Sequence, residues 1–131
     1  MCNCTNVLVA TLSAYVLGGL WYSPLLFMKP WTQSSHGDTN RFIHASTSPG
    51  TYLFTGLMNF MTASFLEYQL KDITCMIEGI RYSCIIGIFL IFTAYGSTYS
   101  FSGNDMRLLL IDSLYHIVKL ITMAVILIGF K

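Results

Sequence analysis

Charged residues are scarce in this sequence of 131 residues, and their scarcity argues against a water-soluble domain. They make up 10% of the chain, whereas a typical soluble domain carries roughly 25%. The formal net charge is +1, and no run of basic residues exists that would bind a phosphate backbone. Hydrophobic residues make up 54% of the chain. We therefore expect a lipid bilayer as the main partner of the chain and no nucleic-acid partner.

Cysteine is also too sparse to define a structure or a site. Small disulfide-stapled proteins are cysteine-dense, polar and loop-rich, and this chain has none of these properties. Cys2 and Cys4 stand close together but lack the second pair that a zinc site needs. The sequence therefore predicts no disulfide framework, no metal site and no cofactor.

Four long apolar runs follow one another along the chain, and each is close to the roughly 20 residues that cross a bilayer. They span residues 7–27, 50–68, 82–99 and 108–130. Lipid offers the backbone no hydrogen-bond partner, and residues 84–92 lack the alternation of a barrel strand, so we expect helices. Residues 28–49 are rich in Ser, Thr and Gly and predict a polar, exposed loop. The predicted fold is all-α: one membrane domain over residues 1–131, built as a four-transmembrane-helix bundle.

The predicted topology gathers polar residues at one end of this bundle. Spans one and three run in one direction and spans two and four run back. Residues late in spans one and three therefore share a depth with residues early in spans two and four. The candidate pocket residues at this end are Trp21, Tyr22, Ser23, Tyr95, Tyr99, Asp112, Tyr115 and His116. Two interpretations stay open, namely an aromatic belt at the headgroup level and a polar pocket.

The last span carries a stripe of polar residues whose exposure to lipid would be unfavourable. Asp112, His116 and Lys119 are spaced at i, i+4 and i+7, which is one helical face. A lysine at the middle of a span costs roughly 2.5–3.5 kcal/mol on the insertion scale, so the stripe should face protein or water. Asn59 has about the same depth as Lys119, which predicts an interhelical contact between the two. The stripe either holds the helices in register or forms a ligand site.

One segment of the first span also has a family likeness. Residues 20–27, Leu-Trp-Tyr-Ser-Pro-Leu-Leu-Phe, followed by Lys29 and Trp31, closely resemble the opening signature of the small membrane proteins called domain of unknown function 1761. Residues 14–19 and 110–116 fit the same pattern, so the resemblance covers nearly the whole chain. It implies a four-span membrane fold and lends no activity.

Two positions depart from the pattern of that family. Met28 stands where the family commonly has glycine, which predicts a stiffer turn after the first span. Lys119 is charged where the resemblance leads us to expect an uncharged residue. The role of this helix face in other family members therefore does not carry over to the polar stripe of this chain.

Three classes of function stay open. The small size and the lack of a catalytic constellation favour a structural or accessory membrane subunit, either a homo-oligomer or part of a larger complex, and this is the function we expect. The second class is a small carrier, channel or sensor for a proton, ion or small polar ligand, with Asp112 and His116 titrating. The third is a membrane enzyme acting on a lipophilic substrate, although no nucleophile is identifiable. Lysine and arginine are tied between the two sides, so the orientation is not predicted.

Overall fold

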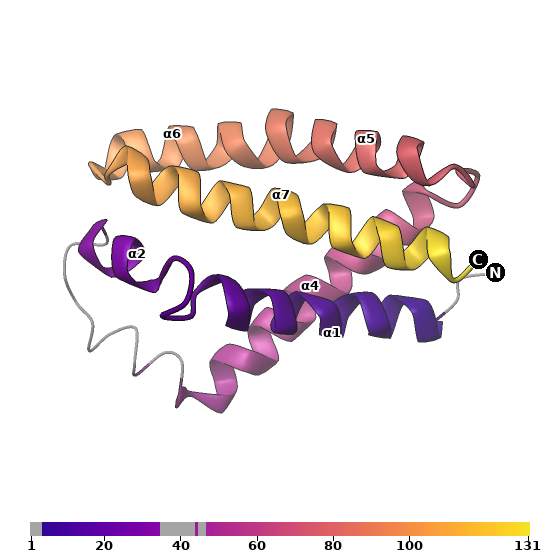
Figure 1. The fold of residues 1–131 in the computed structure, drawn as a ribbon, viewed down its shortest axis with the longest axis horizontal. Helices are drawn as coiled ribbons and strands as arrows, with labels where there is room; N and C mark the ends of the chain where they lie inside the picture. The colour runs from indigo at the N-terminus through magenta and orange to yellow at the C-terminus, as the bar shows by residue number, and fades with distance from the viewer. Residues whose placement is uncertain (1–3, 35–43, 45–46) are drawn as a thin grey trace.

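The computed structural model describes residues 4–34, 44 and 47–131, and every regular element among them is helical. Cys2 and much of the predicted loop 28–49 lie outside the described residues. The elements are α1 (Cys4–Trp21), α2 (Met28–Ser34), α4 (Pro49–Gln69), α5 (Met76–Ile86), the π-helix η1 (Gly87–Phe92), α6 (Thr93–Ser102) and α7 (Met106–Gly129). Figure 1 shows α5 and α6 as parts of one continuous rod, and the start of α1 at the same end of the molecule as the end of α7.

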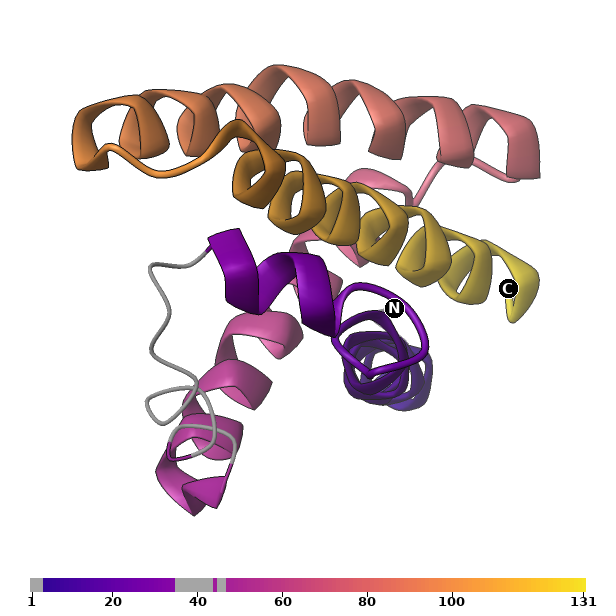
Figure 2. The ribbon, with the colours of Figure 1, turned by 60° about the vertical axis from the view of Figure 1, so that its left-hand side comes forward.

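Helix α7 is the centre of this arrangement. It contacts α1, α2, α4, α5, η1 and α6, and Figure 2 shows it between the α5–α6 rod and α1. The apolar core lies along its second half, where Met123 and Leu127 pack with Leu66 of α4 and Ala10 of α1. The first half of α7 instead carries Asp112 and its polar neighbours. We call this end of the bundle, marked by Trp21, Tyr99 and Asp112, the polar end.

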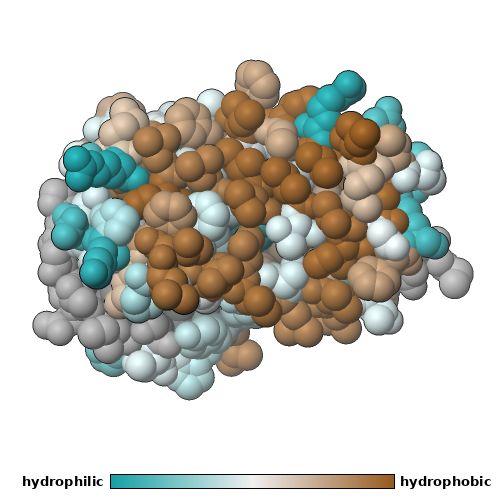
Figure 3. Space-filling view, viewed as in Figure 1, coloured by the Kyte–Doolittle hydropathy of each residue, from teal (hydrophilic) through white to brown (hydrophobic). Residues whose placement is uncertain are grey.

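Three helical segments are long and apolar enough to cross a membrane, judged by length and composition. They are Cys4–Trp21, Met76–Ser102 and Met106–Gly129. Figure 3 shows hydrophobic residues over the middle of one face and hydrophilic residues toward both of its ends, as expected where a protein surface meets lipid. The second predicted span, residues 50–68, corresponds to α4, which has 21 residues but is not among these three segments.

The observed helices differ from the predicted runs at their ends. The predicted run 7–27 stops being helical at Trp21. Pro24 has no backbone N–H to continue the helix, and the chain turns there, with the Met28 N–H donating to the Ser23 carbonyl at 3.2 Å. The predicted run 82–99 is longer in the structure, because the rod begins before it and ends after it.

The prediction of a loop from Met28 onward is wrong for its first seven residues, which form α2. Pro30 falls in the first turn of this helix, where a missing N–H is tolerated because no intrahelical acceptor is available. Helix α2 packs against α7, and Trp31 supplies the half-buried contact described below. Polar composition alone did not reveal this tertiary partner.

The π-helix η1 packs against α7. A Cβ atom added to Gly87 would be 2.6 Å from Cγ1 of Ile117, so only glycine permits this approach of the two backbones. A π-helical turn widens the helix and shifts the register of the residues that follow it. Tyr95 and Tyr99, which follow η1 and are four residues apart, both reach partners on α7.

Candidate functional site

Asp112 is the centre of the polar end. Asp112 is 8% exposed, and its carboxylate accepts three hydrogen bonds. Tyr22 Oη and Trp31 Nε1 donate to Oδ1 at 2.7 and 3.0 Å, and Tyr99 Oη donates to Oδ2 at 2.6 Å. These donors come from the turn after α1, from α2 and from α6. One carboxylate therefore ties three separate segments to α7.

Trp31 is the residue of this cluster that sequence reasoning missed. Trp31 falls in the predicted loop 28–49, whereas its ring lies edge-on to Tyr22, with 5.8 Å between the ring centroids. The available signal was its place in the segment that carries the family likeness, shortly after Tyr22 and Pro24. A tryptophan that packs near a membrane helix needs an acceptor for its indole N–H, and Asp112 provides it.

His116 and Tyr95 form a second pair, one helical turn along α7 from Asp112. Tyr95 Oη lies 2.9 Å from His116 Nε2, and the two rings are stacked with centroids 5.4 Å apart. The neighbouring Tyr115 donates its hydroxyl to the carbonyl of Ala14 at 3.2 Å. These contacts join α6, α7 and α1.

Lys119 has the partner that its depth predicts. Its Nζ donates to Oδ1 of Asn59 on α4 at 3.1 Å, and the two residues are 6% and 3% exposed. The ammonium also lies 5.7 Å from the ring centroid of Tyr115. The structure thus brings Asn59 and Lys119 together, and it buries the Asp112 and Lys119 side chains within the protein.

Trp21 and Ser23 have more local contacts. The Trp21 indole N–H donates to the carbonyl of Ile111 at 3.2 Å, and its ring lies 6.2 Å from that of Tyr115. The Ser23 hydroxyl donates to the Leu20 carbonyl at 2.6 Å. Trp21 therefore anchors the end of α1 on α7, whereas the Ser23 side chain stabilises its own turn rather than joining the Asp112 cluster.

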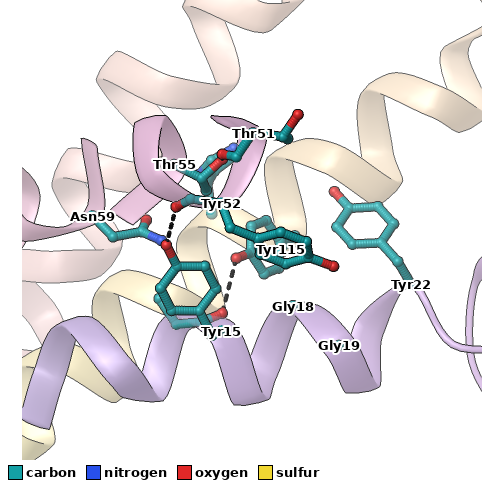
Figure 4. Close-up of a pocket in the computed structure, with 11 residues that line it drawn as sticks. Tyr15, Gly18, Gly19, Tyr22, Thr51, Tyr52, Thr55, Asn59 and Tyr115 are labelled. Carbon is teal, nitrogen blue, oxygen red and sulfur yellow. Dashed lines mark hydrogen bonds between the residues drawn. The ribbon is translucent and has the colours of Figure 1, made fainter. Parts of the chain in front are cut away.

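A cavity of about 600 Å³ lies beside these residues, lined by α1, the Tyr22 turn, α4 and α7. Four tyrosines, Tyr15, Tyr22, Tyr52 and Tyr115, form much of its wall, as Figure 4 shows. Two of them are fixed by hydrogen bonds to backbone, Tyr15 to the carbonyl of Tyr52 and Tyr115 to that of Ala14. The aromatic part of the wall is therefore held in place from both α1 and α4.

The rest of the wall is small or uncharged. Ala14, Gly18 and Gly19 line the cavity from α1, and Asn59 and His116 are among its few strongly polar groups. A Cβ added to Gly18 would lie 3.0 Å from the Tyr115 hydroxyl, whereas one added to Gly19 would meet nothing within 4 Å. Among the described residues, those that line the cavity include no carboxylate, lysine or arginine.

The charged groups of the polar end already have hydrogen-bond partners. The Asp112 carboxylate already accepts three hydrogen bonds, and Lys119 is bound to Asn59. Within the described part of the chain, no three His, Cys, Asp or Glu side chains are grouped closely enough to hold a metal ion. The polar end thus offers a fixed scaffold with an adjacent hydrophobic cavity.

One comparison with known proteins gives a result. The family model described as "Protein of unknown function (DUF1761)" matches residues 5–128, a range that includes the Asp112 cluster and the cavity lining. No curated protein and no solved structure matches the chain significantly. Any function must therefore be argued from the geometry of the polar end.

Proposed function

Because the chain belongs to the DUF1761 family, whose description names no activity, we propose its function from its geometry: a four-span membrane protein that binds a small lipophilic molecule. The observation that carries this proposal is the cavity of about 600 Å³ between α1, α4 and α7. Small-molecule sites are usually concave, roughly 300–1,000 Å³ in volume, and mostly apolar with a few well-placed polar groups. The tyrosine-lined cavity has this composition.

The four-span part of the proposal requires α4 to lie in the bilayer. Large apolar side chains of α4 are exposed, among them Leu53 at 77%, Phe54 at 65% and Phe65 at 50%. Such exposure is unfavourable in water but natural against lipid. The two termini of the described chain also lie at the same end of the fold (Figure 1), which suits an even number of crossings.

The polar residues of α4 do not argue against its insertion. Asn59 is buried against Lys119, and the Thr55 and Thr62 hydroxyls donate to the carbonyls of Thr51 and Met58 within the same helix, at 2.7 and 2.9 Å. Side chains satisfied in this way lower the average hydropathy of a segment without presenting unpaired groups to lipid. Glu67 is the one charged residue of α4 and lies near its end.

Cysteine labelling tests whether α4 crosses the membrane. Single cysteines at Thr47, Asp72 and Ser102, placed in a background whose native cysteines are serine, report the side of each connection in sealed vesicles. With α4 inserted, we expect a membrane-impermeant maleimide to reach Thr47→Cys and Ser102→Cys from the same side, and Asp72→Cys from the opposite side. Labelling of positions 47 and 72 from one side would place α4 outside the bilayer.

The cavity suits a lipophilic molecule better than a free ion. A dehydrated ion needs charged or strongly polar ligands to replace its hydration shell, and the described lining provides no charged side chain. Tyrosine rings and small residues instead provide apolar area and flat faces for packing. Exposed lining residues of α4, such as Thr51, Tyr52 and Thr55, give the cavity an edge that a molecule dissolved in the bilayer can reach.

Filling the cavity from Gly19 tests the binding function. Leucine at this position enters open space and favours the helix, so Gly19→Leu should fold. In lipid nanodiscs we expect the wild type to bind the aromatic hydrocarbon fluorene above the level of empty discs, and Gly19→Leu to bind it about tenfold more weakly. Gly96→Leu on α6 is the matched control, because its added Cβ also meets nothing within 4 Å and it does not line the cavity. Equal binding by all three proteins would refute a ligand site here.

The other functions predicted from the sequence have less geometric support. A structural or accessory subunit, whether as a homo-oligomer or in a larger membrane complex, stays a prediction. A carrier or channel for protons or ions also stays a prediction, and the structure gives Asp112 and His116 separate hydrogen-bond partners. Native mass measurement of the protein extracted from membranes would test the first of these.

A further inference from the structure

We propose that Asn59 is the recognition residue of the cavity and that the bound molecule is an uncharged, ring-containing lipophile with a ketone-type carbonyl oxygen. This inference rests on the proposed function and adds the chemical class of its ligand. Four features carry it, namely the orientation of the Asn59 amide, its unused donor, the charge behind it and the shape of the wall.

Lys119 fixes the orientation of the Asn59 amide. An ammonium group has three donors and no acceptor, so only the amide oxygen can face it, and Oδ1 accepts from Nζ at 3.1 Å. The amide nitrogen occupies the other branch of the planar group and is therefore directed away from the ammonium. Figure 4 shows the Asn59 side chain extending from α4 toward the cavity, which it lines.

The N–H groups of the Asn59 amide are free to donate to a ligand. Asn59 is 3% exposed, yet its described hydrogen bonding consists of the contact made through Oδ1, so Nδ2 has no acceptor among the described residues. An acceptor placed in the cavity beside this nitrogen would gain a hydrogen bond from it. A carbonyl oxygen that enters the cavity would supply the missing acceptor.

The positive charge of Lys119 favours an uncharged acceptor group on the ligand. An ammonium bound to the amide oxygen polarises the amide and strengthens its N–H groups as donors. A cationic ligand would meet this positive charge with no carboxylate in the described lining. An anionic ligand would lose its hydration shell on entering the cavity. It would gain no direct contact with the Lys119 ammonium in return, because that group is bound to Asn59. A neutral acceptor avoids both penalties.

The wall selects for flat rings. Tyr15 and Tyr115 are held in fixed positions by their backbone hydrogen bonds, so their rings form preorganised surfaces against which a planar molecule can pack. Gly19 leaves open space on the α1 side. A flat ring system carrying one carbonyl group therefore matches both the apolar wall and the Asn59 donor.

A pair of probes that differ only in the carbonyl group tests this inference. Fluorenone and fluorene have the same ring skeleton, and only fluorenone has a ketone oxygen. We expect wild-type protein in nanodiscs to bind fluorenone about tenfold more tightly than fluorene, since one hydrogen bond of ordinary strength is worth about this factor. The infrared carbonyl stretch of bound fluorenone should also shift to lower frequency than that of fluorenone in empty discs.

Asn59→Asp is the decisive variant. The carboxylate keeps an acceptor for Lys119, so the helix contact is retained, but it replaces the donating NH₂ group with an acceptor. We expect fluorenone binding to fall about tenfold or more and fluorene binding to change less than about twofold. Asn104→Asp, in the turn between α6 and α7 and outside the cavity lining, is the matched control and should bind both probes like the wild type.

The possible failures are distinguishable. Equal affinity for the two probes in the wild type, or an unshifted carbonyl stretch, would overturn the role of Asn59 while leaving the binding function intact. These two readouts need no variant, so they hold even if Asn59→Asp does not fold. If neither probe binds better to the wild type than to Gly19→Leu, the proposed function fails together with this inference.

Discussion

Asp112→Leu should lower the free energy of unfolding by roughly 3–6 kcal/mol, because it leaves three half-buried donors without their acceptor. The hydroxyls of Tyr22 and Tyr99 and the indole N–H of Trp31 all donate to this carboxylate. Each hydrogen bond to a charged group contributes roughly 1.5–3 kcal/mol, and bonds that share one acceptor group do not add fully. Titration of the detergent-solubilised protein with sodium dodecyl sulfate, followed by circular dichroism, measures the change.

Asp112→Asn is the control for this substitution. Its amide oxygen still accepts from Tyr22 and Trp31, and the Tyr99 hydroxyl can rotate to accept from the amide nitrogen. We therefore expect a loss of less than roughly half of that seen for leucine, since the bonds become neutral but none is lost. If Asp112→Leu is instead as stable as the wild type, the cost of burying the carboxylate equals what its hydrogen bonds contribute.

The second large effect is expected at the contact between Asn59 and Lys119. Asn59→Leu removes the acceptor and leaves an ammonium buried in a membrane-spanning helix, so we expect a loss of roughly 3–5 kcal/mol. Lys119→Met removes the charge itself and should cost less than about 2 kcal/mol, because the freed amide oxygen of Asn59 is neutral. The same detergent titration applies to both variants.

The double variant gives the decisive comparison. Asn59→Leu with Lys119→Met leaves neither a charge nor an unpaired amide, so it should be more stable than Asn59→Leu alone. The double-mutant cycle should therefore give an interaction energy of roughly 1–3 kcal/mol. Strict additivity of the two single effects would mean that the two side chains are not coupled, contrary to the 3.1 Å contact.

The sequence predicted those features that depend on average polarity and on depth in the bilayer. The helical character of the four apolar runs follows from hydropathy and length. The Asn59–Lys119 contact was predictable because both residues lie near the middle of antiparallel segments. The inward direction of Asp112 and Lys119 was predictable because lipid rejects charge.

Features that depend on a particular tertiary partner were not predictable in this way. The helix α2 lies in a polar stretch, and its Trp31 has Asp112 of α7 as an acceptor, a partner that composition does not reveal. The π-helix η1 begins at Gly87, which lies close to Ile117 on another helix. The cavity depends on how α4 crosses α1 and α7, and helix tilt is set by packing rather than by hydropathy.

The contacts of α2 also give the protein a built-in optical probe. Its two tryptophans, Trp21 and Trp31, both bind acceptors on α7 at the polar end, namely the Ile111 carbonyl and the Asp112 carboxylate. Tryptophan emission, excited selectively over that of tyrosine, therefore arises from this end of the molecule, although most of the apolar core lies at the other. Release of α2 from α7 would expose the Trp31 indole, so a spectral shift would report undocking of one short helix before the remainder unfolds.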